Sequence, residues 1–313
     1  MKVLFPVRVF FFIALLSFPP ALAQTQEVSS IFWKVSAKDN SKPTYLFGTH
    51  HLHNFDFIED NPIIDASLEQ ADIVVGEVVI DPNDLSIVTK LASKMRLENN
   101  SLDRLLTEAQ YKATDACLRK YMGFGIQPFN SFKPIFIYQL IMVAKYMKSQ
   151  DEESSQVPGM MDGTFGNSMD VYFQEEGKKQ EKKIQGLETV DQQLSVLIDG
   201  YSLERQVEML MEMVEDKSEG GDSELEELDR LYNQQNLSGL FELMQKSTPA
   251  EELQKLLIDR NINWIPQIEK IINNQQSAFI AVGAGHLPGP YGLIKLLRQK
   301  GYTLEPIKIS VSP

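Results

Sequence analysis

Two kinds of apolar pattern alternate along this chain. Short, nearly continuous apolar runs near both ends predict buried strands, whereas apolar residues spaced three to four apart in the middle predict helices. The expected strands lie at 30–37, 44–48, 72–80, 182–189, 277–282 and 302–309, and helices dominate from about 84 to 272. The pattern predicts an α/β (α+β) fold, with a mixed central sheet built from both ends of the chain and a large helical insertion.

Two stretches of the expected insertion have a distinctive pattern. Residues 191–213 have the spacing of one amphipathic helix. Residues 215–229 carry many acids around Gly220-Gly221, which predicts a mobile, solvated loop that opens another helix. The spacing of these acids does not match an EF-hand, so a calcium loop is disfavoured.

The N-terminus has the pattern of a cleavable secretory signal. Lys2 and Arg8 precede an apolar run at 9–16, and Ala21-Leu-Ala23 provides the small residues of a cleavage site. The uninterrupted apolar run is too short for a membrane anchor, since a span needs about 20 residues. We therefore expect a signal peptide at 1–23, a single mature domain at 24–313, and no membrane span after cleavage.

The composition restricts the cell compartment in which the protein is expected and the partners that it can bind. The only cysteine, Cys117, cannot form an internal disulfide, and export without disulfides favours a bacterial periplasm reached across the inner membrane. The formal net charge of −13 argues against nucleic acid and against anionic membrane surfaces as partners.

All four histidines follow expected buried strands. His50, His51 and His53 come after the strand at 44–48, and His286 comes after the strand at 277–282. Both places fit Gly-x-x-His, ending at His51 and His286. Since ligands of an α/β sheet bind at the carboxyl ends of its strands, we expect both histidines to share one crevice.

Glu77 lies inside the expected central strand at 72–80, and a buried carboxylate requires a partner or a metal ion. His51, Glu77 and His286 would supply three ligands and leave positions open for water and substrate. The alternative is that the histidines are hydrogen-bonded structural residues and that Glu77 points to water. Asp170 and Glu188 are the other candidate acids, for which a capping or surface role is equally open.

Three other site classes fit the sequence poorly. His51-Leu-His53 spells the H-x-H of amidohydrolase barrels, but those sites need further histidines on later strands and only His286 remains. No Gly-x-Ser-x-Gly elbow is present, which disfavours a serine hydrolase. Gly283-Ala-Gly-His286 lacks the third glycine of a dinucleotide-binding turn.

Six segments together resemble the TraB/GumN family, in order and over nearly the whole mature chain. They are Leu46-Phe-Gly-Thr-His-His-Leu52, Val75-Gly-Glu77, Lys183-Ile-Gln-Gly-Leu-Glu-Thr189 with Gln192-Gln193, Leu257-Ile-Asp-Arg-Asn-Ile-Asn-Trp264, Val282-Gly-Ala-Gly-His-Leu-Pro-Gly289 and Gly292-Leu-Ile-Lys-Leu-Leu-Arg-Gln-Lys-Gly-Tyr302.

The resemblance implies both a fold and a site. The family is related to the Tiki metal-dependent proteases and to a wider superfamily of erythromycin-esterase-like and ChaN-like haem-binding proteins, with a mixed α/β core and a helical insertion. The shared residues correspond here to His51, Glu77, His286 and Arg260. The superfamily also includes an esterase that works without metal, with histidine as general base.

The sequence therefore predicts an exported hydrolase, a metal-dependent peptidase using Mn, Co or Zn on a peptide or small-molecule substrate. Arg260 would stabilise an oxyanion or pair with Glu77, and Glu188 or Asp170 would be a supporting acid. One alternative is a non-catalytic periplasmic protein that binds haem or a peptide in the same crevice. Another is an interaction protein that docks a partner through its acidic insertion. The substrate, the metal and the oligomeric state stay open.

Overall fold

The computed structural model describes residues 29–37, 40–53, 56–79, 85–150, 168–216, 224–274 and 276–311. The predicted signal peptide at 1–23 and residues 217–223 of the predicted acidic loop lie outside the described residues. Among the helices that are described, none combines the length and the apolar character needed to cross a membrane.

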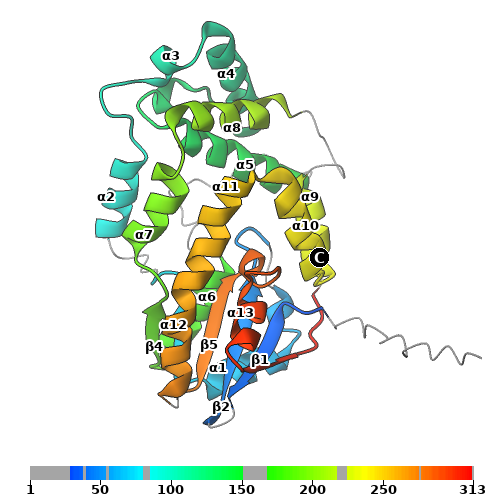
Figure 1. The fold of residues 1–313 in the computed structure, drawn as a ribbon. Helices are drawn as coiled ribbons and strands as arrows, with labels where there is room; N and C mark the ends of the chain where they lie inside the picture. The colour runs from blue at the N-terminus through cyan, green and yellow to red at the C-terminus, as the bar shows by residue number, and fades with distance from the viewer. Residues whose placement is uncertain are drawn as a thin grey trace, which may run out of the picture.

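A six-stranded mixed sheet forms the lower half of the molecule in Figure 1. Its strand order is β4-β3-β5-β2-β1-β6; β4, β3, β5 and β2 run parallel, and β1 is antiparallel to β2 and β6. The strands are β1 (Phe32–Ala37), β2 (Asn40–Thr49), β3 (Ile73–Gly76), β4 (Lys183–Gly186), β5 (Ala278–Gly283) and β6 (Thr303–Pro306). The predicted mixed sheet with strands from both ends of the chain is confirmed.

The centre of the sheet follows from its apolar content. β5 pairs with β2 on one side and with β3 on the other, and its residues from Ala278 to Val282 are all buried. Strands buried on both faces read as continuous apolar runs, which is why the pattern at 277–282 identified this strand. Phe47, Phe173 and Phe279 pack against one another between the sheet and α6 (Met169–Lys179).

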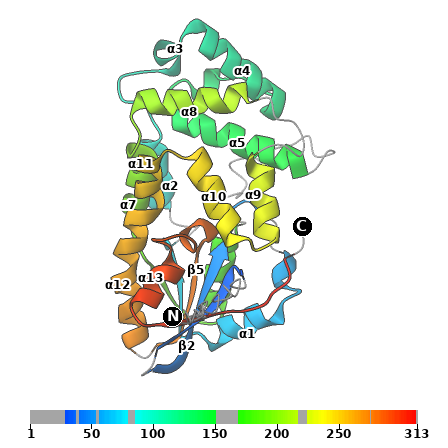
Figure 2. The ribbon, with the colours of Figure 1, turned by 45° about the vertical axis from the view of Figure 1, so that its right-hand side comes forward.

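Helices cover both faces of the sheet and extend beyond its carboxyl edge. α12 and α13 lie on one face and α1 and α6 on the other, while the remaining helices stand above the sheet (Figures 1 and 2). Besides α6, the helices are α1 (Pro62–Gln70), α2 (Leu85–Lys94), α3 (Leu102–Leu105), α4 (Glu108–Met122), α5 (Pro134–Gln150), α7 (Val190–Leu194), α8 (Leu203–Glu215), α9 (Glu224–Asn233), α10 (Leu237–Ser247), α11 (Ala250–Leu253), α12 (Asp259–Asn273) and α13 (Leu293–Gln299).

The helices above the sheet have an apolar core of their own. Leu118, Ile137, Ile141 and Leu210 pack there, in a cluster separate from the one around the sheet. The region from 84 to 272 is therefore a helical insertion, as predicted, but α6 and β4 inside it return to the sheet.

Two of the differences between predicted and observed elements lie next to the site. The single helix expected at 191–213 is broken: α7 continues into a π-helical segment, Ser195–Asp199, and α8 starts afresh after Ser202, whose hydroxyl accepts from the Arg205 backbone N–H. The strand expected at 72–80 ends at Gly76, so Glu77 follows the strand instead of lying within it. The backbone oxygens of Gly76 and Glu77 accept hydrogen bonds from the chain just after β4, which extends the contact between the two strands past their ends.

Candidate functional site

Four parallel strands end at the same edge of the sheet, and each is followed by a side chain predicted for the site. His51 follows β2, Glu77 follows β3 and Glu188 follows β4, while His286 lies in the 3₁₀ turn Ala284–His286 after β5. Since these strands are neighbours in the sheet, the structure brings together residues that are up to 235 positions apart. Arg260 reaches the same edge from α12.

Gly283 shows how closely three of these side chains approach. A Cβ added to this glycine would lie 3.2 Å from Oε1 of Glu77 and 3.7 Å from the ring of His286. Nε2 of His51 would be 3.9 Å from the same point. The two imidazoles and the carboxylate therefore surround one small space, which a glycine leaves open and a larger residue would fill.

Glu77 is buried and every oxygen of its carboxylate has a partner. Oε1 accepts from the Gly283 backbone N–H at 2.9 Å, and Oε2 accepts from Nη2 of Arg260 at 2.5 Å and from Nε2 of Gln193 at 3.0 Å. Burial alone would raise the pKa of Glu77, but the facing basic groups of His286 and Arg260 outweigh it and lower this pKa to about 2. Glu77 is therefore ionised at neutral pH.

Arg260 joins the two acids at this edge. Its Nη2 and Nε donate to both oxygens of Glu188 at 2.6 and 3.2 Å, and the same Nη2 donates to Glu77. The guanidinium also stacks over Trp264, 4.7 Å from the ring centre. These side chains are more than nine-tenths buried, so the guanidinium neutralises two carboxylates that burial would otherwise disfavour. Of the two predicted roles of Arg260, the geometry supports pairing with Glu77.

His286 is buried against Trp264, with 4.4 Å between the ring centres. Burial lowers the pKa of His286 to about 3, so this imidazole is neutral at neutral pH. Its Nε2 lies 3.1 Å from Nη1 of Arg260 and 3.6 Å from Oε1 of Glu77, and its Nδ1 lies 2.7 Å from Oδ1 of Asn261.

His51 differs from His286 in exposure and in charge. Its side chain is 62% exposed, and its Nδ1 lies 2.6 Å from Oδ2 of Asp170, which is itself buried. The hydroxyl of Thr49 donates to the other oxygen of Asp170 at 3.0 Å. The Asp170 carboxylate raises the pKa of His51 to about 9. Asp170 therefore orients the ring, so that Nε2 faces the space above Gly283.

The other two histidines anchor the loop that carries His51. Nδ1 of His50 accepts from the backbone N–H groups of Leu52 and His53, and its Nε2 lies 3.3 Å from a carboxylate oxygen of Asp229 in α9. Burial lowers the pKa of His50 to about 3. Nε2 of His53 lies 2.7 Å from Oδ1 of Asn233, also in α9. These contacts give His50 and His53 a structural role.

Two of the three predicted metal ligands, Glu77 and His286, lie about as far apart as two ligands of one divalent ion. Oε1 of Glu77 and Nε2 of His286 are 3.6 Å apart, and two ligands on one zinc ion are about 3.4 Å apart. The described side chains contain no ready-formed group of three such ligands. Arg260 donates to His286 and Glu77 and would have to release Nε2 of His286 for an ion to bind there.

A cleft of about 1090 Å³ opens beside this network, between the end of β4, the π-helical segment after α7 and α12. Glu188 and Arg260 form part of its wall, and Val79, Trp264 and Asn263 also line it. The cleft is therefore large enough for several residues of a peptide and reaches the charged side chains at the strand ends.

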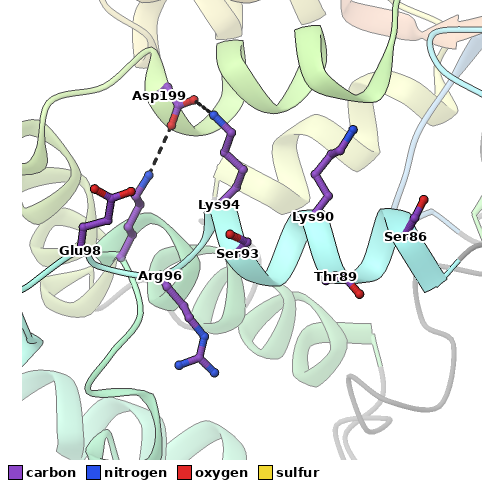
Figure 3. Close-up of a pocket in the computed structure, with 9 residues that line it drawn as sticks. Ser86, Thr89, Lys90, Ser93, Lys94, Arg96, Glu98 and Asp199 are labelled. Atoms are coloured by element: carbon purple, nitrogen blue, oxygen red, sulfur yellow. Dashed lines mark hydrogen bonds and ion pairs between the residues drawn. The ribbon is translucent and has the colours of Figure 1, made fainter.

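A second cleft, of about 730 Å³, lies along α2 (Figure 3). Figure 3 shows Lys94 pointing toward Asp199, which also accepts from Lys133. Lys90, on the same face of α2, pairs with Asp191. Lys94 and Lys133 thus share Asp199, and each lysine of this second cleft has an acidic partner. None of the residues that line it is a histidine.

Fold and site together define an α/β protein in which histidines, acids and an arginine converge at the carboxyl ends of parallel strands. The chain belongs to the TraB/PrgY/gumN family, whose profile matches residues 31–306. This match confirms the resemblance inferred from the six sequence segments. No curated protein matches the chain.

The sequence analysis gave no role to several side chains that complete the site. Thr49 and Gln193 bind the carboxylates of Asp170 and Glu77, and Asn261 and Trp264 contact His286. Asn261 and Trp264 were inside a recognised segment with Arg260, and their positions one and four residues later put all three on one face of a helix. That spacing could have identified them.

Proposed function

We propose that this chain is an exported hydrolase that cleaves peptides with a divalent ion held by His51, Glu77 and His286. Mn, Co and Zn are the candidate ions. A bound ion would acidify a water molecule and polarise the scissile carbonyl. The protein's own residues would orient the ligands, keep Glu77 ionised and bind the substrate.

The observation that carries the proposal is the contrast between the two imidazoles. His51 is the exposed member, and the Asp170 carboxylate on Nδ1 keeps Nε2 directed at the space above Gly283. A carboxylate behind a histidine fixes ring orientation in metal sites and also in catalytic dyads. His286 and Glu77 lie deeper and are held by hydrogen bonds.

Arg260 and Glu188 have supporting roles in this proposal. Arg260 fixes Glu77 and keeps it ionised, and Glu188 holds Arg260 by two hydrogen bonds. The adjoining cleft would receive the peptide, with Val79 and Trp264 as apolar contacts. The N-terminal signal pattern at 1–23 supports export to the periplasm.

The test uses purified protein that begins at residue 24. Wild type and His51→Ala would be incubated with a mixture of peptides and with Mn, Co or Zn, and the products identified by mass spectrometry. We expect cleavage and bound metal in wild type, and loss of both in His51→Ala. Lys90→Ala, which removes a charged side chain from the second cleft, is the control and should cleave like wild type. Cleavage that is equal in all three proteins would rule the site out.

A binding function is the second candidate. An exposed imidazole whose far nitrogen is held by a carboxylate is also suited to ligate haem iron. Haem titration decides this case: an absorption band that appears with wild type and is abolished in His51→Ala, together with no peptide cleavage, would favour haem binding over hydrolysis.

A further inference from the structure

Asn261 lies next to Arg260 in α12 and is 2% exposed. Its Nδ2 donates to the backbone oxygens of His286 and Tyr291 at 3.1 and 2.9 Å. Its Oδ1 lies 2.7 Å from Nδ1 of His286. The side chain therefore contacts both the backbone and the ring of the same histidine.

These contacts determine which nitrogen of His286 carries its hydrogen. Backbone carbonyl oxygens only accept hydrogen bonds, so the amide end that faces two of them is the NH₂ group. The oxygen of Asn261 must then face Nδ1 of His286. A neutral ring in contact with an acceptor carries its hydrogen at that nitrogen, which assigns N–H to Nδ1.

The contact on the opposite side of the His286 ring independently places the hydrogen on Nδ1. Nη1 of Arg260 lies 3.1 Å from Nε2 of His286. A guanidinium only donates hydrogen bonds, so Nε2 must present a lone pair. Asn261 and Arg260 therefore agree on one form of the ring, with a hydrogen on Nδ1 and a lone pair on Nε2.

We propose that Asn261 is a positioning residue that holds His286 in this form, so that the Nε2 lone pair faces Glu77 and the space above Gly283. In the other tautomer an N–H at Nε2 would face the donating group of Arg260 and could not bind an ion. The consequence for catalysis rests on the proposed hydrolase function, whereas the form of the ring does not.

Nuclear magnetic resonance of nitrogen-15-labelled histidine reads the form of the ring directly. The chain has four histidines, and comparison with His286→Gln assigns the signals of His286. In metal-free wild type at neutral pH we expect long-range proton–nitrogen correlations to show a protonated Nδ1 and an unprotonated Nε2. A protonated Nε2 with an unprotonated Nδ1 would overturn the proposal without any further variant.

Asn61 provides a matched control for substitution of Asn261. It is also buried, its Nδ2 donates to the backbone oxygens of Phe57 and Ser310, and its Oδ1 accepts from the Ser310 backbone N–H. Asn61→Ala and Asn261→Ala thus remove the same kinds of hydrogen bond, but only Asn261→Ala removes one from a histidine.

In Asn261→Ala only Arg260 still favours N–H at Nδ1, so we expect a second set of His286 signals with N–H at Nε2 to appear and kcat/KM to fall by at least about tenfold. Asn61→Ala should lower thermal stability and leave the His286 signals and kcat/KM unchanged. If Asn261→Ala keeps the wild-type pattern, or if Asn61→Ala changes it equally, Asn261 is merely structural.

Asn261→Asp covers the case in which the alanine variant does not fold. It keeps the size of the side chain and an acceptor opposite Nδ1, so Nδ1 of His286 should stay protonated; loss of that proton would contradict the proposal. Absence of peptide cleavage in wild type would remove the proposed hydrolase function, while the wild-type spectrum would still decide the tautomer.

Discussion

His51 and His286 both close a Gly-x-x-His motif, yet their pKa values shift in opposite directions. His51 is exposed beside the Asp170 carboxylate, which raises its pKa to about 9. His286 is buried, which lowers its pKa to about 3. In the metal-free protein the same motif therefore provides one imidazole that is charged at neutral pH and one that is neutral, and an ion bound at Nε2 of His51 would displace its proton.

Asp170→Asn tests the ion pair between Asp170 and His51. The amide keeps the shape of the side chain but removes its charge, so the pKa of His51 in the metal-free protein should fall from about 9 toward 6.5. A proton NMR titration of the His51 ring measures this midpoint. Asp191→Asn, an exposed aspartate paired with Lys90, should leave the midpoint unchanged. An unchanged midpoint in Asp170→Asn would contradict the assigned contact.

The same shifts predict how stability depends on pH. The folded pKa of His286 lies below the unfolded value of 6.5, so its contribution is present above pH 6.5 and is lost as the pH falls toward 3. The folded pKa of His51 lies above 6.5, so its contribution is present below pH 6.5 and is lost as the pH rises toward 9.

The free energy of unfolding of the metal-free protein should therefore decrease on both sides of about pH 6.5. Urea unfolding at pH values from 4.5 to 9 measures it. His286→Gln should make the acid side less steep without abolishing it, because the pKa of buried His50 is lowered in the same way. Asp170→Asn should flatten the alkaline side. A steady rise in stability from pH 6.5 to 9 in wild type would contradict the raised pKa of His51.

At the scale of elements, α12 is the helix that assembles the charged part of the site. Arg260, Asn261 and Trp264 lie on its buried face, where they contact both acids and His286. The ends of the strands supply the groups that face this helix, among them Glu77, Glu188 and His286. Substitutions on this face should affect stability as well as function.

Arg260→Met tests this point. The apolar side chain fills much of the volume but leaves Glu77 and Glu188 buried without their shared cation. We expect a loss of about 3–5 kcal/mol in the free energy of unfolding, measured with urea. Arg230→Met, at an exposed arginine paired with Glu227, should cost less than about 1 kcal/mol. Similar small losses in both variants would show that the buried pairs are not needed.

The turn after β5 offers a second test at this scale. In Gly283→Ala the added methyl lies 3.2 Å from Oε1 of Glu77 and fills the space between the histidines. We expect metal affinity and kcat/KM to fall by at least about tenfold. Gly285→Ala is the control in the same turn, because its methyl meets the flexible side chain of Met244. Equal activity in both variants would show that the space above Gly283 is not used.

At the scale of the whole molecule, the sequence predicted the strands of the sheet well and the side-chain contacts between distant elements poorly. Apolar runs that end in glycine marked the strands on either side of the insertion, because a fully buried strand leaves a continuous apolar pattern. Because parallel strands have their carboxyl ends at the same edge of a sheet, the residues after these strands could be expected to lie close together. The end of β3 was misplaced, because Val78 and Val79 extend the apolar pattern past Gly76 where the strand stops.

The sequence named Asp170 as a candidate acid but did not predict which residue it contacts. Asp170 meets His51 across 119 positions, and its sequence neighbourhood fits an ordinary helix start equally well. The break between α7 and α8 was missed, since amphipathic spacing continues through it while Gly200 and the Ser202 cap end one helix and begin another. Such features depend on packing between elements, which one stretch of sequence does not contain.

The central claim is that one site at the strand ends hydrolyses peptides. The most direct measurement is kcat/KM for a cleaved peptide, compared between metal-loaded wild type and His51→Ala. The account predicts a decrease of about 10²–10⁴-fold in His51→Ala, compared at a temperature where both proteins are folded, because the variant also loses the pair with Asp170. Equal values for the two proteins, or no hydrolysis by wild type with Mn, Co or Zn, would contradict it.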